Sequence, residues 1–174
     1  VFQADIQNAF LQGKLKQREF IRPPEGMKGI PPGHLLELLV PVYGLRYAPS
    51  SFVQALALHL TEGMGFRRLT GDPCVYINED LGCIIGAYID DLVICLEDPN
   101  RMPFIMSQLR ERFTIKEGEG APVDWLLGMR VRQNLDEGYI SIDQELAISK
   151  LAKALLSPSE METASSVRHP MLHS

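Results

Sequence analysis

The amino-acid sequence predicts an α+β fold, in which helices pack on one face of an antiparallel sheet. Short runs of β-branched and aromatic residues alternate with amphipathic helical segments along the chain. A hairpin signal joins two of the predicted strands directly, as antiparallel neighbours allow. With 174 residues, 45% of them hydrophobic, the chain is long enough to bury one sizeable core.

The first part of the chain predicts a strand, an irregular segment and a helix. Residues 1–6 (VFQADI) alternate as a strand does, and the helical turn that follows ends at a glycine. A brief strand at residues 19–22 precedes a loop rich in proline and glycine, and a broken apolar run predicts an extended piece after it. Residues 48–66 predict a helix, because Pro49 suits its first turn and two glycines end it.

The middle of the chain predicts three strands and a second helix. Residues 72–78 and 83–89 are apolar runs joined by the hairpin signal EDLG, and residues 92–97 supply a partner strand. Residues 99–113 predict an amphipathic helix whose apolar stripe includes Phe104.

The last part predicts a hairpin, a third helix and a polar end. Residues 124–133 and 138–143 are expected to pair, and residues 144–156 form an amphipathic helical pattern. Residues 157–174 are polar and without periodicity, which is typical of a linker or tail. One domain is therefore expected over residues 1–156.

Composition narrows the class of protein. The net charge of −5 argues against a protein that binds nucleic acid unaided, although residues 1–50 carry six basic and four acidic side chains. No apolar run is long enough for a membrane span and no signal peptide opens the chain, so we expect a soluble, unexported protein. Three cysteines without zinc-ligand spacing predict buried thiols in a reducing compartment. The start at Val1, without methionine, suggests a piece of a longer polyprotein.

Two adjacent carboxylates interrupt the apolar run CIIGAYIDDLVICL. In the middle of a buried strand, Asp90 and Asp91 would place one charge in the core, so we expect them at a hairpin turn. An acidic structural turn is the plain alternative, since aspartate favours turns. The turn nevertheless lacks the glycine or asparagine that tight hairpins prefer.

Asp5 stands at the end of the first predicted strand, immediately before a helical turn. If that strand lies beside the hairpin, Asp5, Asp90 and Asp91 converge, and three carboxylates repel one another unless a hard cation lies among them. Carboxylate oxygens are the ligands that Mg²⁺ and Mn²⁺ select, and a pair of such ions supports phosphoryl transfer. The alternative is a solvated acidic face, because residues 51–100 carry eight acidic and two basic side chains.

An ordered set of motifs resembles the reverse transcriptases of copia-type retrotransposons. The segments ADIQNAFLQG, PPEGM, VYGLRYAPSSF, GFRRLTGDPCVYI, YIDDLVI and WLLGMRV occur in that family's order, up to about residue 156. The resemblance implies a polymerase palm, a ferredoxin-like antiparallel sheet with helices on one face, together with part of the fingers. It also implies RNA-directed DNA polymerase activity with two Mg²⁺ ions, or Mn²⁺ in their place.

The resemblance assigns roles to three aspartates and an aromatic residue. Asp5 and Asp90 match the two metal-binding catalytic aspartates, and Asp91 matches their catalytically important neighbour, a less direct ligand. Phe10 matches the aromatic side chain that excludes a ribose 2′-hydroxyl and so selects deoxynucleotides. A core phenylalanine at helical spacing is the structural alternative for Phe10.

Further segments correspond to substrate-binding parts of the family. The nucleotide pocket is matched by Tyr43, Gly44 and Arg46, where Gly44 would allow close backbone approach and Arg46 could meet a phosphate. Lys116 matches a lysine near the leaving pyrophosphate, with a solvated surface lysine as the alternative. The primer grip is matched by Trp125, Leu126, Gly128 and Met129, which as bare sequence predict a buried strand.

The implied partners are an RNA or DNA template, a DNA primer, deoxynucleoside triphosphates, and the fingers, thumb and ribonuclease H segments of the same polyprotein, with no membrane. The implied location is intracellular, in cytoplasmic virus-like particles and in the nucleus. The family pattern YGLKQAPR.W is altered at Tyr47, Ser50 and Phe52, which removes one cation. Two alternatives stay open: an inactive palm remnant that persists as a folded or binding domain, and another two-metal palm enzyme such as a nucleotide cyclase.

Overall fold

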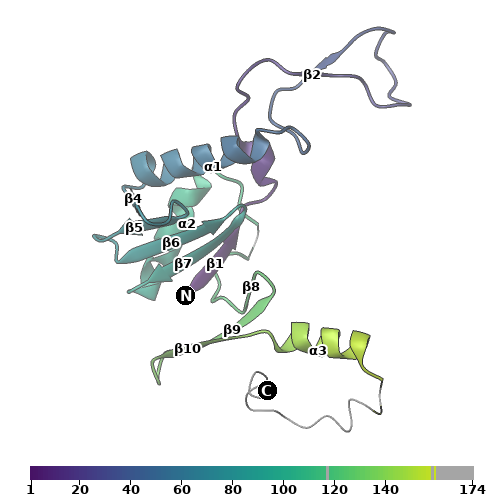
Figure 1. Ribbon diagram of the computed structural model, residues 1–174. Coiled ribbons are helices and arrows are strands. Elements are labelled where there is room, and N and C mark those ends of the chain that lie inside the picture. The colour runs from purple at the N-terminus through teal and green to yellow at the C-terminus, as the bar shows by residue number, and fades with distance from the viewer. Residues whose placement is uncertain (117, 158, 160–174) are drawn as a thin grey trace. The chain divides into compact units, whose positions relative to one another are not determined.

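The computed structural model describes residues 1–116, 118–157 and 159 (Figure 1). It divides into two compact units, Val1–Pro122 and Val123–Ser174. Both units mix helices with antiparallel strands, so the predicted α+β class is confirmed. No helix in the described ranges combines the length and apolarity needed to cross a membrane.

The first unit contains a five-stranded antiparallel sheet. Its strand order is β1-β7-β6-β5-β4, with the bounds β1 Phe2–Asp5, β4 Arg67–Arg68, β5 Val75–Asn78, β6 Cys83–Tyr88 and β7 Asp91–Leu96. The expected EDLG hairpin joins β5 to β6, because Asn78 pairs with Cys83. Along the outer edge of β1 runs a further antiparallel stretch, through isolated bridges from Ile115 to Ile6 and from Pro122 to Phe2.

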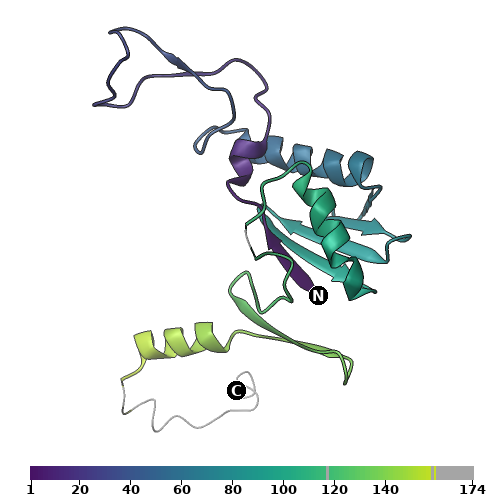
Figure 2. The same cartoon turned by 180° about the vertical axis from the view of Figure 1, so that it is seen from behind.

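Two helices and several short turns complete this unit. The helical elements are η1 Ala9–Gln12, α1 Ala48–Leu58, the π turn η2 His59–Gly63, η3 Pro99–Arg101 and α2 Met102–Arg110. Side chains from α1 and α2, including Phe52 and Ile105, share one buried cluster with Ile85 and Ile94 of the sheet. Figure 2 shows α2 lying across one face of this sheet. The helices therefore cover a single sheet face, as the sequence predicted.

One detail of the second helix differs from prediction. The phenyl ring of Phe104 is half exposed, whereas α2 buries Met102, Ile105, Met106 and Leu109. These four positions repeat at the three- and four-residue spacing of a helical face, and Phe104 lies one residue outside that stripe. The prediction that Phe104 belongs to the buried face was wrong.

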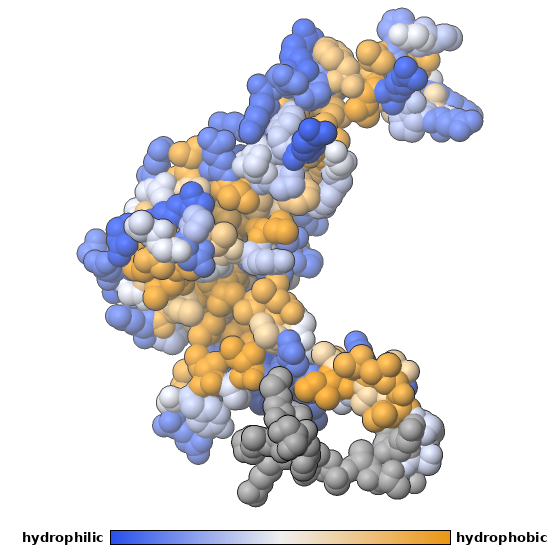
Figure 3. All heavy atoms as spheres, in the orientation of Figure 1, coloured by the Kyte–Doolittle hydropathy of each residue, from blue (hydrophilic) through white to orange (hydrophobic). Residues whose placement is uncertain are grey.

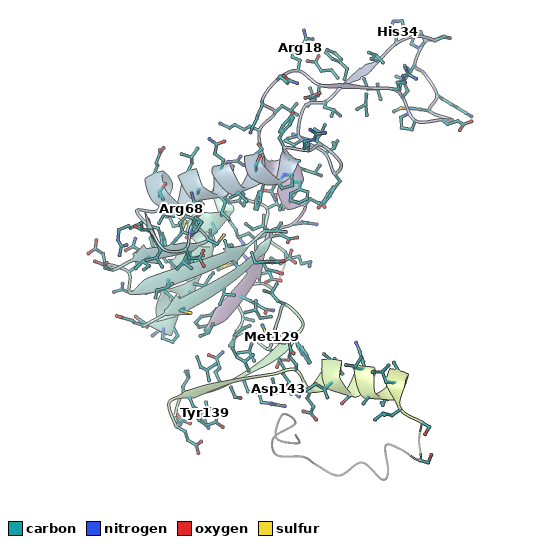
Figure 4. All side chains as sticks on the ribbon, in the orientation of Figure 1. Arg18, His34, Arg68, Met129, Tyr139 and Asp143 are labelled. Carbon is teal, nitrogen blue, oxygen red and sulfur yellow. The ribbon has the colours of Figure 1, made fainter. Side chains whose placement is uncertain are left out.

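An extended segment leaves the core of the first unit between η1 and α1. It carries the short pair β2 (Phe20–Ile21) and β3 (Leu36–Glu37). The Arg18 guanidinium, labelled in Figure 4, forms an ion pair of 2.7 Å with the Glu37 carboxylate across this pair. The predicted strand at residues 19–22 is thus confirmed, inside a mostly irregular loop.

The second unit is a three-stranded sheet, in the order β10-β9-β8, followed by a helix. Its elements are β8 Trp125–Leu126, β9 Met129–Asn134, β10 Tyr139–Asp143 and α3 Glu145–Leu155. Apolar side chains of α3, including Ile148, Leu151 and Leu155, are exposed. Figure 3 shows a hydrophobic area over this helix. The predicted tail, residues 157–174, lies outside the described residues except for positions 157 and 159.

The cysteines only partly match expectation. Cys83 is buried, and burial raises the pKa of its thiol to about 12, with the nearby Cys95 as a smaller cause. Cys95 is partly buried and Cys74 is exposed. The prediction of three buried thiols was therefore wrong for Cys74, which lies just before β5 begins.

Candidate active site

The two adjacent aspartates lie at a two-residue hairpin turn, as predicted. Strand β6 ends at Tyr88 and β7 begins at Asp91, and these two residues pair across the hairpin. The turn is Ile89–Asp90. Ile89 has φ = 56°, and of the two turn residues only Ile89 has a positive φ. This pattern is characteristic of a type II′ turn, which normally has glycine at its first position.

A β-branched residue at this φ is strained, so the turn predicts a stability effect. We expect Ile89→Gly to raise the free energy of unfolding by about 0.5–1 kcal/mol, because glycine removes the left-handed penalty and Ile89 is already 43% exposed. Ile84→Gly is the matched control, since Ile84 is equally exposed but lies within β6 without a positive φ. Urea denaturation measures the free energy of unfolding of both variants. A loss of stability in Ile89→Gly as large as in Ile84→Gly would contradict the proposed strain at Ile89.

Asp5 lies directly beside this turn. Strand β1 pairs antiparallel with β7, with Asp5 opposite Asp91, and the Ile6 amide donates a hydrogen bond of 2.9 Å to the Asp90 carbonyl oxygen. The predicted adjacency of Asp5 and the hairpin, separated by about 85 positions in the sequence, is thus present in the structure.

The carboxylates lie on the sheet face that the helices leave open. Ala4 and Leu92, which neighbour Asp5 and Asp91 in their strands, are buried in the core beneath the helices. Because side chains alternate along a strand, Asp5 and Asp91 point to the opposite face. Charged side chains can therefore gather there without entering the core.

The stretch that follows α2 places Lys116 beside Asp5. Its backbone amide donates to the Asp5 carbonyl oxygen at 3.1 Å, and its Nζ forms an ion pair of 2.9 Å with Oδ2 of Asp5. The hydrogen bond and the charge of Asp5 raise the pKa of Lys116. The structure thus brings together four residues that the sequence singled out, Asp5, Asp90, Asp91 and Lys116.

Negative charge at this site is only partly compensated. Burial raises the pKa of Asp91, and the charges of Asp90 and Asp5 raise it further, whereas Lys116 opposes the shift.

Sequence reasoning missed a further carboxylate, Glu119. Burial and then the charge of Asp5 raise the pKa of Glu119, while the Asp5 backbone amide and Lys116 lower it. Only its position three residues beyond Lys116 could have signalled it.

Burial and repulsion at Asp91 predict a pH-dependent stability. A carboxyl with a raised folded pKa stabilises the fold fully below its unfolded pKa, and that stability is lost as the pH rises through the folded pKa. We therefore expect Asp91→Asn to match the parent near pH 3 and to exceed it by about 0.5–1 kcal/mol near pH 7. Urea midpoints across this range measure the effect, with exposed Asp136→Asn as the control. A difference that is constant with pH would contradict the assigned cause.

Two predicted nucleotide-binding residues are also in contact. The ring of Phe10, in η1, lies 5.0 Å from the ring of Tyr43 between centroids, at an interplanar angle of 51°. Phe10 is half buried against the core cluster and Tyr43 is largely exposed. Gly44 has φ = 99°, and a Cβ there would meet no atom within 4 Å, so glycine suits the turn for its backbone conformation. Arg46 is exposed at the approach to α1.

The predicted primer-grip residues form a hairpin in the second unit. The expected single strand 124–133 is divided into β8 and β9, because Leu127 (φ = 48°) and Gly128 (φ = 80°) form a tight turn between them. Trp125 is 40% exposed, so the simple expectation of a buried strand was wrong there. Met129, labelled in Figure 4, begins β9. The role of this hairpin stays a prediction.

The described residues contain no group of three or more histidine, cysteine, aspartate or glutamate side chains arranged to hold a metal ion. The donor chemistry nevertheless suits a hard divalent cation, since Asp5, Asp90 and Asp91 offer only carboxylate oxygens. The ammonium group of Lys116 already compensates one of them. Lys116 is thus the cation that the structure places beside these carboxylates.

The first unit is thus an antiparallel sheet with carboxylates at a strand end and at a hairpin turn of its open face. Residues 1–173 match the family described as reverse transcriptase (RNA-dependent DNA polymerase). The chain therefore belongs to this family, and its similarity to transposon Pol polyproteins of plants and yeast places it among the copia-type members. No solved structure matches the chain significantly.

Several curated relatives carry this similarity over nearly the whole chain. The retrovirus-related Pol polyprotein from transposon TNT 1-94 of Nicotiana tabacum is 26% identical, covering 98% of this chain and 13% of that protein. The Pol polyprotein from transposon RE1 of Arabidopsis thaliana is 27% identical, covering 97% of this chain and 11% of that protein. The transposon Ty1-DR1 Gag-Pol polyprotein of Saccharomyces cerevisiae is 24% identical, covering 91% of this chain and 9% of that protein. The chain thus spans only about an eighth of these relatives or less.

Proposed function

We propose that this chain is the palm, with part of the fingers, of a reverse transcriptase that extends a DNA primer on an RNA or DNA template by two-metal nucleotidyl transfer. The observation that carries the proposal is the pairing of Asp5 with Asp91 beside the Ile89–Asp90 turn, on the open face of the sheet. The family match supports the reaction class.

The topology of the first unit supports a ferredoxin-like palm. From the edge inward, the stretch around Ile115, then β1, β7 and β6 lie side by side and antiparallel. In chain order, β1, α1, β6, β7, α2 and the stretch around Ile115 follow the β-α-β-β-α-β pattern of that fold, with β4 and β5 added between α1 and β6. The proposed domain covers residues 1–156, and residues 157–174 are proposed as a linker.

Asp5, Asp90 and Asp91 would hold two Mg²⁺ ions, or Mn²⁺. Bound there, these ions would lower the pKa of the primer 3′-hydroxyl and stabilise charge on the phosphate. The protein's own contribution is position: paired strands fix Asp5 and Asp91, and the strained turn fixes Asp90. Lys116 would exchange Asp5 for the phosphates of the leaving group, which carry the greater negative charge.

Primer, template and deoxynucleoside triphosphates are the proposed partners, together with fingers, thumb and ribonuclease H segments of a polyprotein. The proposed location is intracellular, in virus-like particles and the nucleus. The small share of each relative that the chain covers supports a need for neighbouring segments, as does its net charge of −5, which opposes a primer–template duplex.

Primer extension tests this proposal. A polyprotein segment containing the chain, supplied with Mg²⁺, deoxynucleotides and a primed RNA template, is expected to lengthen the primer, and chelation of the metal should stop it. Absence of extension by a segment that is folded, as judged by circular dichroism, would favour the inactive palm remnant instead.

Phe10 predicts sugar selectivity. We expect Phe10→Ala to raise ribonucleotide incorporation relative to deoxynucleotide incorporation by at least about tenfold, because the alanine side chain no longer fills the space of a 2′-hydroxyl. Single-nucleotide extension kinetics with matched ribo- and deoxynucleotides give this ratio. Phe20→Ala, which removes an exposed phenyl ring from β2, should leave the ratio unchanged. An unchanged ratio in Phe10→Ala would assign Phe10 to packing against Tyr43 only.

A further inference from the structure

A pocket of about 520 Å³ lies in the first unit and shares no residue with the carboxylate site. Its walls are the segment Lys14–Lys16, the outer side of α1 with the π turn that follows it, and Arg112 beyond the end of α2. Because α1 covers the buried face of the sheet, this pocket and the carboxylates belong to different faces. Its volume falls in the range of small-molecule sites, about 300–1,000 Å³.

The pocket is cationic in an acidic chain. Lys14, Lys16 and Arg112 line it, and Glu62 is the one acid among the described lining residues. Within the part of the chain that the structure describes, none of these three cations has a carboxylate within ion-pair distance. Lys16 Nζ lies 5.7 Å from the centroid of the Tyr47 ring, and Cζ of Arg112 lies 5.1 Å from that of Phe113. These rings do not neutralise charge, so three cations against one acid leave the hollow positive, which favours an anionic ligand.

A fixed stretch of backbone carries Lys14 and binds the side chain of Arg112. The Lys14 amide donates to Oγ of Ser51 at 2.8 Å, and that hydroxyl donates in turn to the Lys14 carbonyl oxygen. The Arg112 guanidinium donates to the Gln12 carbonyl oxygen at 2.8 Å, two residues before Lys14. A Cβ at Gly13 would lie 2.9 Å from Oγ of Ser51, so this stretch is pressed against α1. The backbone of Lys14 and the guanidinium of Arg112 are therefore anchored to one stretch of chain before any ligand arrives.

The remaining lining suits the apolar body of a ligand. Leu15, Ala55 and Leu58 provide apolar surface, and the Gln54 amide offers both a donor and an acceptor. One wall is the π turn His59–Gly63, a distortion that is frequent at functional sites. The His59 ring is fixed there by a hydrogen bond of 2.9 Å between Nε2 and the Gln108 carbonyl oxygen.

We propose that this pocket binds a nucleotide, with the phosphates at Lys14, Lys16 and Arg112 and the base over the apolar surface of Leu15 and Leu58. The nucleotide is either free in solution or one unit of a nucleic acid strand; both present the same phosphate and base. Binding here needs no divalent metal, so it is independent of the polymerase proposal.

Isothermal titration of the full chain in EDTA separates this site from the carboxylates. The probes are deoxythymidine triphosphate, a short oligothymidylate and inorganic pyrophosphate. We expect saturable binding by at least one thymidine-bearing probe, with pyrophosphate weaker. Tight binding by the free triphosphate identifies the free nucleotide as the ligand, and binding by the oligothymidylate alone identifies the strand.

Three variants make the assignment specific. The double change Lys14→Glu and Lys16→Glu should weaken binding by at least about tenfold, since charge-assisted hydrogen bonds are lost. Gln54→Glu keeps the side-chain shape, adds a negative charge and should weaken binding severalfold. Lys28→Glu, in the exposed loop, repeats the charge change elsewhere and should bind like the parent. No binding of any probe, or binding that Lys14→Glu/Lys16→Glu and Gln54→Glu leave unchanged in folded protein, would overturn the proposal.

Discussion

Replacing Asp90 with asparagine is expected to lower primer extension by about a thousandfold or more, because loss of this proposed metal ligand would remove several kcal/mol of transition-state stabilisation. Asp90 occupies the turn between β6 and β7, and its side chain is partly buried beside Asp5 and Asp91. Asparagine keeps the size and the turn-forming side chain but removes the negative charge. The fold should therefore survive, and the loss should appear in the rate of extension.

Asp80→Asn is the matched control for Asp90→Asn. Asp80 is an exposed aspartate in the hairpin loop at the opposite end of β6, so the same chemical change there should leave extension unchanged. Single-turnover extension under saturating Mg²⁺ measures both variants. Extension by Asp90→Asn at the rate of the parent would remove the proposed role of this residue in metal binding.

Replacing Phe52 with alanine is expected to lower the free energy of unfolding by about 3–5 kcal/mol, a large fraction of the stability of a typical domain. Phe52 is fully buried in α1, and its ring meets the ring of Phe113 edge to face, with centroids 5.9 Å apart. Alanine would leave a cavity under the helix that holds the core against the sheet. Loss of this packing should lower the thermal midpoint by about 10 °C.

Val53→Ala tests whether burial is the cause. Val53 is the next residue of α1 and is exposed, so its truncation should cost less than about 1 kcal/mol. Urea denaturation followed by circular dichroism compares the two variants. Alanine favours the helix at both positions, so equal losses at Phe52 and Val53 would contradict burial of Phe52 as the cause.

Local pattern was sufficient to predict β1 and α1 of the first unit, although it missed the short strand β4. The alternation of residues 1–6 and the spacing of apolar residues in 48–66 correctly predicted β1 and α1, since each pattern is set by the geometry of one element. The predictions that failed depended on packing or on backbone conformation. Phe104 fits an apolar stripe as well as Ile105 does, and only packing against the sheet selects one of them. The break at Leu127–Gly128 depends on positive φ values that apolar composition does not signal.

The sequence by itself determined which residues carry charge, and that Asp90 and Asp91 must lie at a turn, because adjacent strand residues face opposite sides and a charge cannot be left in the core. Tertiary structure alone decided that Asp5 faces Asp91, that Lys116 reaches Asp5, and that Glu119 joins them. It also formed the pocket between Lys14 and α1. These contacts join residues far apart in the chain, and their energies depend on the pairing of strands and helices rather than on any local periodicity.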